Sequence, residues 1–136
     1  MPGQPTTPGA NKMLDALTGR ATQTAQTTFL ALCTTAPTDT ALGAELTAPT
    51  TNGYSRQTIT WTAPTGDPSS TGNSALITFG PFTADLGIVS HIMLMDVATA
   101  GVAANCLAYW TVDVVKDPAN GDSITIAIGA LVMTAD

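Results

Sequence analysis

The chain has a single histidine, and this residue decides whether a hydrolase-type site can be assembled. Such a site needs a nucleophile, a base and an orienting acid. His91 lies within residues 88–97, a run in which both parities are apolar. A histidine in such a run is typical of a buried side chain that bonds a backbone carbonyl. We therefore expect a protein that is not an enzyme.

Metal and cofactor chemistry has little support in the residue spacing. Cys33, His91 and Cys106 are far apart in the sequence and form none of the short ligand pairs used for zinc. Asp113, Asp117 and Asp122 surround a Pro-Ala-Asn-Gly turn, where weak calcium binding competes with ordinary bonding of turn carboxylates to nearby amides. The turn role is the commoner of the two. With no glycine-rich phosphate loop in the sequence, we predict no cofactor.

The two cysteines, Cys33 and Cys106, fall inside predicted strands. A cysteine in a strand usually behaves as a small buried hydrophobe. Alternation places Cys106 on the same side of its strand as Ala108 and Trp110, with Tyr109 on the other side. A disulfide would require the two cysteine strands to face each other, which the sequence leaves open.

Charge excludes two classes of partner. The chain has 4 Lys and Arg against 10 Asp and Glu, a formal net charge of -6. The basic residues are scattered at Lys12, Arg20, Arg56 and Lys116, whereas phosphate contacts need clustered cations. The longest apolar run, residues 86–97, is too short for a membrane span. We therefore predict no nucleic-acid partner, no membrane span and, from the N-terminal residues, no secretory signal.

Strand patterns organise the rest of the chain. Residues 56–62 alternate apolar and polar side chains, and residues 88–97 are apolar on both parities, which predicts a central strand. Further strands are predicted at residues 27–34, 74–79, 106–115 and 124–132, the last with a kink at Gly129. Residues 36–53 and 64–73 are predicted as loops, the first with a short strand near residues 45–47. About seven strands at these spacings predict one all-β domain, an antiparallel sandwich of Greek-key or jelly-roll type.

The N-terminal segment is predicted to differ from the sandwich. Residues 1–10 are rich in Pro and Gly and predict an extended arm, before a single domain at residues 11–136. Asn11 is a suitable N-cap for a short helix that ends at Gly19. Met13, Leu14 and Leu17 have helical spacing, and we expect them to pack against the sandwich.

Several motifs resemble those of a known group of proteins. They are Asn-Lys-Met-Leu-Asp-Ala-Leu-Thr-Gly at residues 11–19, Phe-Leu-Ala-Leu-Cys-Thr-Thr-Ala-Pro-Thr-Asp at residues 29–39, Gly-Tyr-Ser-Arg-Gln-Thr-Ile-Thr-Trp at residues 53–61 and Ile-Thr-Phe-Gly-Pro-Phe at residues 77–82. In this order, with a Gly-Asp before the last strand, the chain resembles small virion proteins of tailed bacteriophages. Members of that group are described as capsid decoration, minor capsid or tail fibre proteins.

The resemblance implies a structural role in the virion and no catalysis. The first expectation is a decoration protein that binds the major capsid protein lattice on the head surface and stabilises it. A tail or fibre component and a receptor- or carbohydrate-binding module are the alternatives, and a homo-oligomer, such as a trimer, is expected. Contacts with partners are predicted for residues of the arm, of the loop at residues 38–52 and of two strands: Gly3, Gln4, Pro5, Pro8, Thr38, Asp39, Glu45, Arg56 and Tyr109.

Overall fold

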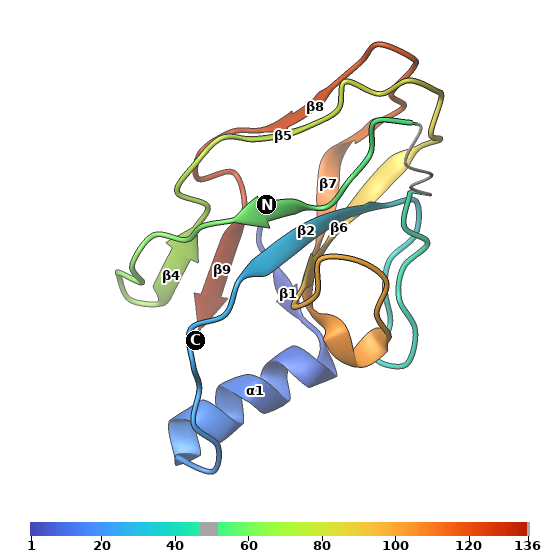
Figure 1. Cartoon of the computed structure of the whole chain (residues 1–136). Coiled ribbons are helices and arrows are strands. Elements are labelled where there is room, and N and C mark those ends of the chain that lie inside the picture. Colours follow the sequence, from blue (N-terminus) through green and yellow to red (C-terminus); the bar gives the residue numbers. More distant parts are fainter. Residues whose placement is uncertain (47–51, 136) are drawn as a thin grey trace.

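The computed structural model describes residues 1–46 and 52–135, and within them the chain is built mainly of short strands (Figure 1). The elements in chain order are β1 (Gln4–Pro5), α1 (Thr7–Thr18), β2 (Thr28–Cys33), β3 (Gln57–Ile59), β4 (Ser69–Gly72), β5 (Ile77–Phe79), β6 (Val89–Met95), the 3-10 turn η1 (Ala103–Asn105), β7 (Cys106–Lys116), β8 (Ile124–Ile126) and β9 (Val132–Ala135). All pairs among these strands are antiparallel. The predicted all-β class with a short N-terminal helix is confirmed.

A five-stranded sheet of order β1-β7-β6-β2-β3 forms one layer of the sandwich. β6 lies at its centre and pairs with β2 on one side and β7 on the other. Four consecutive β6 side chains, from Ile92 to Met95, are buried. The central position predicted from the unbroken apolar run is therefore confirmed, because only a strand covered on both faces hides side chains of both parities.

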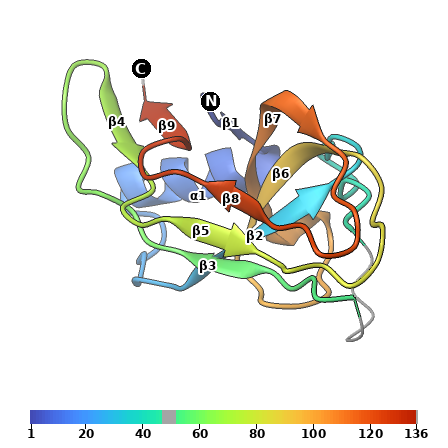
Figure 2. The ribbon, with the colours of Figure 1, turned by 90° about the horizontal axis from the view of Figure 1, so that it is seen from above.

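The main core lies between one face of this sheet and the ribbon formed by β5 and β8 (Figure 2). The sheet contributes side chains from β2, β6 and β7, among them Leu32, Ile92 and Trp110. The ribbon contributes Phe79 and Ile126 from the opposite side. The second layer consists of the ribbons β4-β9 and β5-β8, each of two strands, so the packing is that of a sandwich with a divided second layer.

The opposite face of the sheet carries a second, smaller apolar cluster. Ala31 and Cys33 of β2 meet Met93 and Met95 of β6 there, together with Cys106. A register shift between Leu94 and Met95 accompanies the pairing of Met95 with Cys106. Because of this shift, Cys106 and Trp110 lie on opposite faces of the sheet, and the prediction that placed them on the same side of the strand is wrong.

The C-terminal part differs from the single kinked strand predicted at residues 124–132. It forms two strands, β8 and β9, which belong to different ribbons, and the chain turns between them at Gly129 with a φ of 73°. The buried Asn73 holds this turn: its amide nitrogen donates to Ala127 O at 2.8 Å, and its oxygen accepts from Leu131 N at 3.0 Å. The predicted loop at residues 64–73 contains β4, which pairs with β9.

The N-terminal residues pack on their own chain. Gly3 N donates to Val132 O at 2.6 Å, and β1 pairs Gln4 with Tyr109 on β7. The extended segment ends at Thr6, whose side chain caps α1 by accepting from Gly9 N at 3.3 Å. The helix therefore begins five residues earlier than an Asn11 cap would place it, with Pro8 in the first turn, where a missing amide is tolerated.

Helix α1 faces the sheet through its small residue. Gly9 is buried, and a Cβ added there would overlap the carbonyl of Leu107 on β7. Lys12 binds Asp96 at 2.6 Å, which ties the next turn to the body. Leu14 and Leu17 are 58% and 82% exposed, so the prediction that they pack against the sandwich is wrong. Gly19 ends the helix in the left-handed conformation, as predicted.

Substituting Gly9 tests the close approach of α1 to β7. In a helix interior Gly→Ala normally adds about 1 kcal/mol of stability, but here the new methyl group has no room beside Leu107. We expect Gly9→Ala to lower the free energy of unfolding by about 2 kcal/mol in urea titrations. The exposed Asn11→Ala is the control and changes stability by less than about 0.5 kcal/mol. A stabilised Gly9→Ala variant would contradict this packing.

Candidate interaction surfaces

The first candidate surface is the outward side of α1. Ala10, Met13, Leu14 and Leu17 follow the spacing i, i+3, i+4, i+7 and form one stripe, which we name the α1 stripe. All but Ala10 are exposed, and so is every residue from 16 to 27. In Figure 1, α1 lies below the sheet at the end of the molecule opposite β5 and β8. Met13 lines a cavity with Ser70 of β4 and Met133 of β9, whereas Leu14 and Leu17 form the more exposed part of the α1 stripe.

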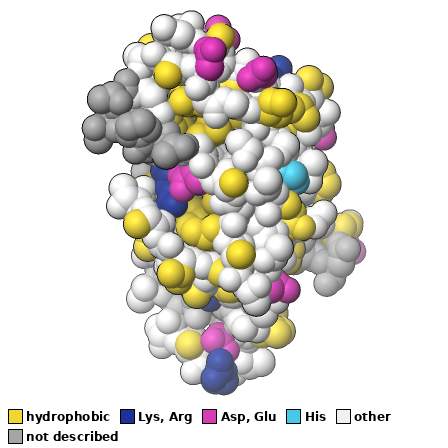
Figure 3. All heavy atoms as spheres, turned by 90° about the vertical axis from the view of Figure 1, so that its right-hand side faces the viewer, with side chains coloured by type: hydrophobic (Ala, Val, Ile, Leu, Met, Phe, Trp, Pro, Cys, Tyr) yellow, Lys and Arg dark blue, Asp and Glu magenta, His cyan; other side chains and the backbone are white. Residues whose placement is uncertain are grey.

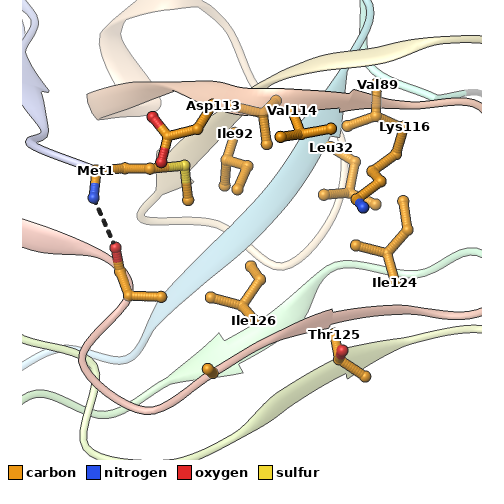
Figure 4. Close-up of a pocket in the computed structure, with 13 residues that line it drawn as sticks. Met1, Leu32, Val89, Ile92, Asp113, Val114, Lys116, Ile124, Thr125 and Ile126 are labelled. Atoms are coloured by element: carbon orange, nitrogen blue, oxygen red, sulfur yellow. Dashed lines mark hydrogen bonds between the residues drawn. The ribbon is translucent and has the colours of Figure 1, made fainter.

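The second candidate surface is a cavity of about 230 Å³ between β7 and β8, which we name the edge groove (Figure 4). Its floor is the main core itself, including Leu32, Ile92 and Ile126. Val114 stands on its rim and is 66% exposed. No part of the described chain buries this side chain.

The edge groove also has charged and terminal groups at its rim. Asp113 and Lys116 of β7 line it, and the Met1 side chain lies at one end (Figure 4). The Met1 ammonium group donates to Ala130 O at 2.9 Å, which holds the N-terminus there. The groove is therefore an apolar slot bordered by one carboxylate and one ammonium side chain.

The outer surface has few charges to discourage association. Figure 3 shows hydrophobic side chains emerging at many points of one face, among mostly uncharged neighbours. Only 10% of all residues are charged. A surface of this kind suits a protein that works in contact with other chains.

Arg56, predicted as an ion-pair anchor for a partner, instead forms an ion pair with a carboxylate of its own chain. Its side chain is only 4% exposed, and it binds Glu45 through two hydrogen bonds of 2.9 and 2.7 Å. It also donates to the carbonyls of Val97 and Ala100 at 2.9 and 2.8 Å. Glu45 accepts a further bond of 2.7 Å from the Tyr54 hydroxyl. Arg56 and Glu45 thus form a partly buried ion pair that joins three segments of the chain.

This ion pair also shifts the acidity of its neighbours. Burial, followed by the Glu45 charge, raises the pKa of the Tyr54 phenol well above its usual value. The hydrogen bonds to Glu45 raise the pKa of Arg56 further. Tyr54 therefore stays neutral and serves as a structural donor, while its oxygen accepts from Leu32 N at 3.0 Å.

The other predicted contact residues also make bonds within the chain. Tyr109 OH donates to Gln4 Oε1 at 2.7 Å, and Pro5 pairs with Ala108, while Gly3 and Pro8 lie in the N-terminal segment already described. Asp39 Oδ1 accepts from Thr7 N at 2.9 Å, a bond that lowers the pKa of this carboxyl group. Thr38 Oγ1 accepts from Ala41 N at 3.1 Å. Of the predicted contact loop, residues 47–51 lie outside the described residues.

His91 is half-buried on the outer side of β6, so the prediction of a fully buried histidine bonded to a backbone carbonyl is wrong. Its Nδ1 lies 2.8 Å from Ser90 Oγ, which itself donates to Thr34 O at 2.7 Å. Because the hydroxyl proton goes to Thr34, Nδ1–H donates to Ser90. Burial lowers the pKa of His91, in keeping with a neutral ring in this bond. The pair orients the ring and leaves the Ser90 hydroxyl occupied.

Cys33 and Cys106 form no disulfide with each other, and both are fully buried. This confirms the prediction that they behave as small core side chains. Burial raises the pKa of the Cys106 thiol to about 11, and it raises the pKa of Cys33 further. At the last turn, Asp122 Oδ2 accepts from Ala119 N at 3.0 Å, the ordinary turn role. In residues 1–46 and 52–135 no three His, Cys, Asp or Glu side chains gather as a metal site.

The structure is thus an antiparallel sandwich with exposed apolar side chains at the outward side of α1 and at the rim of the edge groove. The family model described as podophage GP4 fiber I protein gp80 matches residues 5–134, and the chain belongs to this family. No curated protein matches it. The predicted resemblance is confirmed: this is a small structural protein of the tailed-phage virion, of the group described as tail fibre proteins. The one α-helix in the described ranges is not of a length or hydrophobicity that spans a bilayer.

Sequence reasoning missed both candidate surfaces. The spacing of Met13, Leu14 and Leu17 was visible, but spacing alone does not tell which body covers the stripe. The run Val112-Asp-Val-Val-Lys116 offered a signal for the groove, because two adjacent valines at the end of a strand cannot both face one core.

The ion pair of Glu45 and Arg56 can be tested through stability. Glu45→Ala leaves the buried guanidinium without its counter-charge, and we expect a loss of about 3 kcal/mol in the free energy of unfolding. Asp15→Ala is the matched control, because the pair of Asp15 with the largely exposed Arg20 contributes less than about 1 kcal/mol. Equal losses in the two variants, measured by urea denaturation, would contradict a structural role for Glu45.

The two thiols predict a pH dependence. A folded-state pKa above the unfolded value contributes stability that is fully present below the unfolded pKa, about 8.5, and is lost as pH rises. With Cys106 near 11 and Cys33 higher, the free energy of unfolding should fall from about pH 9 to pH 11. Each thiol lowers the free energy of unfolding by up to about 1.4 kcal/mol per pH unit in this range.

Urea unfolding between neutral pH and about pH 10.5 measures this slope. In a Cys33→Ala/Cys106→Ala variant the decline should be shallower than in the native chain, while Tyr54 continues to contribute at the upper end. Identical slopes in the two proteins would show that the thiols are not the source.

Proposed function

We propose that this protein is a non-enzymatic component of the fibre or tail apparatus of a podophage virion. The observation that carries the proposal is the match of residues 5–134 to a family described as a fibre protein. The match covers nearly all of the sandwich, α1 and every residue of the two candidate surfaces except Met1. The fibre alternative of the sequence analysis therefore fits better than its first expectation, a capsid decoration protein.

The contacts inside the chain support a role without catalysis. Arg56 and Tyr54 both donate to Glu45, and each also bonds a backbone group. His91 bonds Ser90, whose proton is already donated to Thr34 O. A catalytic base and nucleophile need their proton-transfer atoms turned toward a substrate. In this protein Arg56, Tyr54 and Ser90 instead make hydrogen bonds that hold loops and strands together.

The carbohydrate-binding alternative has less support. A sugar-stacking platform needs open aromatic faces. Trp61 is half-buried and stacks on the buried Trp110, with ring centroids 6.1 Å apart. The Tyr109 hydroxyl donates to Gln4, and the Tyr109 ring lies 6.3 Å from the His91 ring, centroid to centroid. The aromatic groups are thus mainly engaged with one another.

Locating the chain in the intact particle tests the proposal. In a cryo-EM map of the virion, the sandwich with its projecting α1 should fit density on the tail or at the base of a fibre. A matched map of particles lacking this chain should lose that density and keep the head shell. Density on the head lattice, with a shell that becomes less stable without the protein, would instead support a decoration protein bound to the major capsid protein.

A further inference from the structure

Three polar side chains from distant parts of the sequence meet where α1 lies against η1 (Figure 1). Lys12 Nζ on α1 donates to Asp96 Oδ2 at 2.6 Å, and Asn105 Nδ2 on η1 donates to Asp96 Oδ1 at 2.8 Å. Because the two oxygens belong to one carboxylate, the lysine nitrogen and the side-chain amide of Asn105 are held next to each other. We propose that Lys12 and Asn105 form an intramolecular isopeptide bond in the folded chain, with Asp96 as the catalytic residue.

The main chain fixes the positions of these groups. Asp96 directly follows β6, and its N–H donates to the carbonyl of Asn105 at 3.1 Å. The start of α1 is held on the residue two places beyond Asn105: Thr6 N donates to Leu107 O at 3.0 Å, and Gly9 packs against the same carbonyl. A reaction between groups held in this way is effectively unimolecular, which favours it by several orders of magnitude over the reaction of a free amine with a free amide.

Asn105 is the electrophile of the proposed reaction. Its Oδ1 accepts from Val102 N at 2.9 Å. When an amine adds to the amide carbon, negative charge develops on this oxygen, and a backbone N–H already aimed at it stabilises that charge.

Asp96 is suited to be the base and not the group attacked. Its carboxylate carries a negative charge that resists a nucleophile, and it bonds both reacting groups at once. The Asp96 side chain is only 15% exposed, which limits exchange of protons with water during the reaction.

The reaction is balanced without an oxidant or a second reactant. Asp96 accepts a proton from the Lys12 ammonium group, and the amine so formed attacks Cγ of Asn105. A new C–N bond gives a tetrahedral intermediate with the negative charge on Oδ1. Asp96 then gives its proton to Nδ2, the bond from Cγ to Nδ2 breaks, and the carbonyl re-forms as ammonia leaves. The extra proton on the lysine nitrogen passes through Asp96 to the ammonia, which departs as ammonium and leaves Asp96 as a carboxylate.

The bond would tie α1 to the sheet covalently. It closes a loop from residue 12 to residue 105, and an unfolded chain that contains such a loop has less conformational freedom. The ion pair by itself is a weaker attachment, because the Lys12 side chain is 40% exposed. The proposal rests on these contacts and does not depend on where in the virion the protein lies.

The intact mass of the purified native chain tests the bond. Its formation removes one molecule of ammonia, so mass spectrometry should find the chain lighter by that amount than its sequence requires. Lys12→Arg keeps a cation beside Asp96 but has no amine that reacts, and it should show its full mass. Lys116→Arg is the matched control: Lys116 lies on β7 at the edge groove, so this variant should lose ammonia as the native chain does.

Tryptic peptides locate the bond. Trypsin cuts after lysine and arginine but not after an acylated Lys12, so the native chain should yield residues 1–20 joined to residues 57–116. Loss of ammonia confined to residues 117–136 would overturn the proposal in favour of a succinimide at the Asn120-Gly121 turn. Loss of water with Lys12 joined to Asp96 would overturn it in favour of Asp96 as the electrophile.

Two further measurements separate the bond from the ion pair. Asp96→Ala removes the base, and a chain with the native circular dichroism spectrum should keep its full mass. Lys12→Arg should melt roughly 10 °C or more below the native chain, since it lacks the covalent closure. A native chain of full mass would overturn the proposal in favour of an ion pair only, and loss of ammonia by Asp96→Ala to the native extent would overturn the catalytic role of Asp96.

Discussion

The burial of β6 on both faces is the constraint on which the rest of the structure depends. Its side chains from Ile92 to Met95 are all removed from water, so each face of the sheet needs its own cover. The ribbon of β5 and β8 covers one face and forms the main core. The other face is closed by a smaller cluster with Leu42 and Val97. The ribbon on one face and the segments that carry Leu42 and Val97 on the other are therefore the parts that keep water from the central strand.

The position of α1 follows from the same requirement. Thr6 caps the helix and its hydroxyl also bonds the carbonyl of Cys106, which anchors the helix start at the edge of the second cluster. Gly9 then lets the helix approach the backbone of β7 closely, and Lys12 binds Asp96. A helix held by a glycine and an ion pair does not need its leucines for attachment. Leu14 and Leu17 are consequently left exposed.

Local patterns predicted the sheet better than they predicted the surfaces. The unbroken apolar run of β6 and the helix stop at Gly19 are local signals, and both are confirmed. The turn held by Asn73 and the ion pair of Glu45 with Arg56 join residues distant in sequence, so no spacing reveals them. Seven of the nine predicted contact residues make side-chain or strand-pairing bonds within the chain, because a polar residue in a loop looks the same whether its partner is internal or external.

Open apolar surface at both ends gives this sandwich a physical reason to belong to a larger structure. A chain with 10% charged residues gains little protection from charge repulsion, and exposed apolar side chains on α1 and at the edge groove are in contact with water in the single chain. In the proposed fibre role, assembly is what would remove these apolar side chains from water, and binding of a partner to the folded chain would then also stabilise its fold.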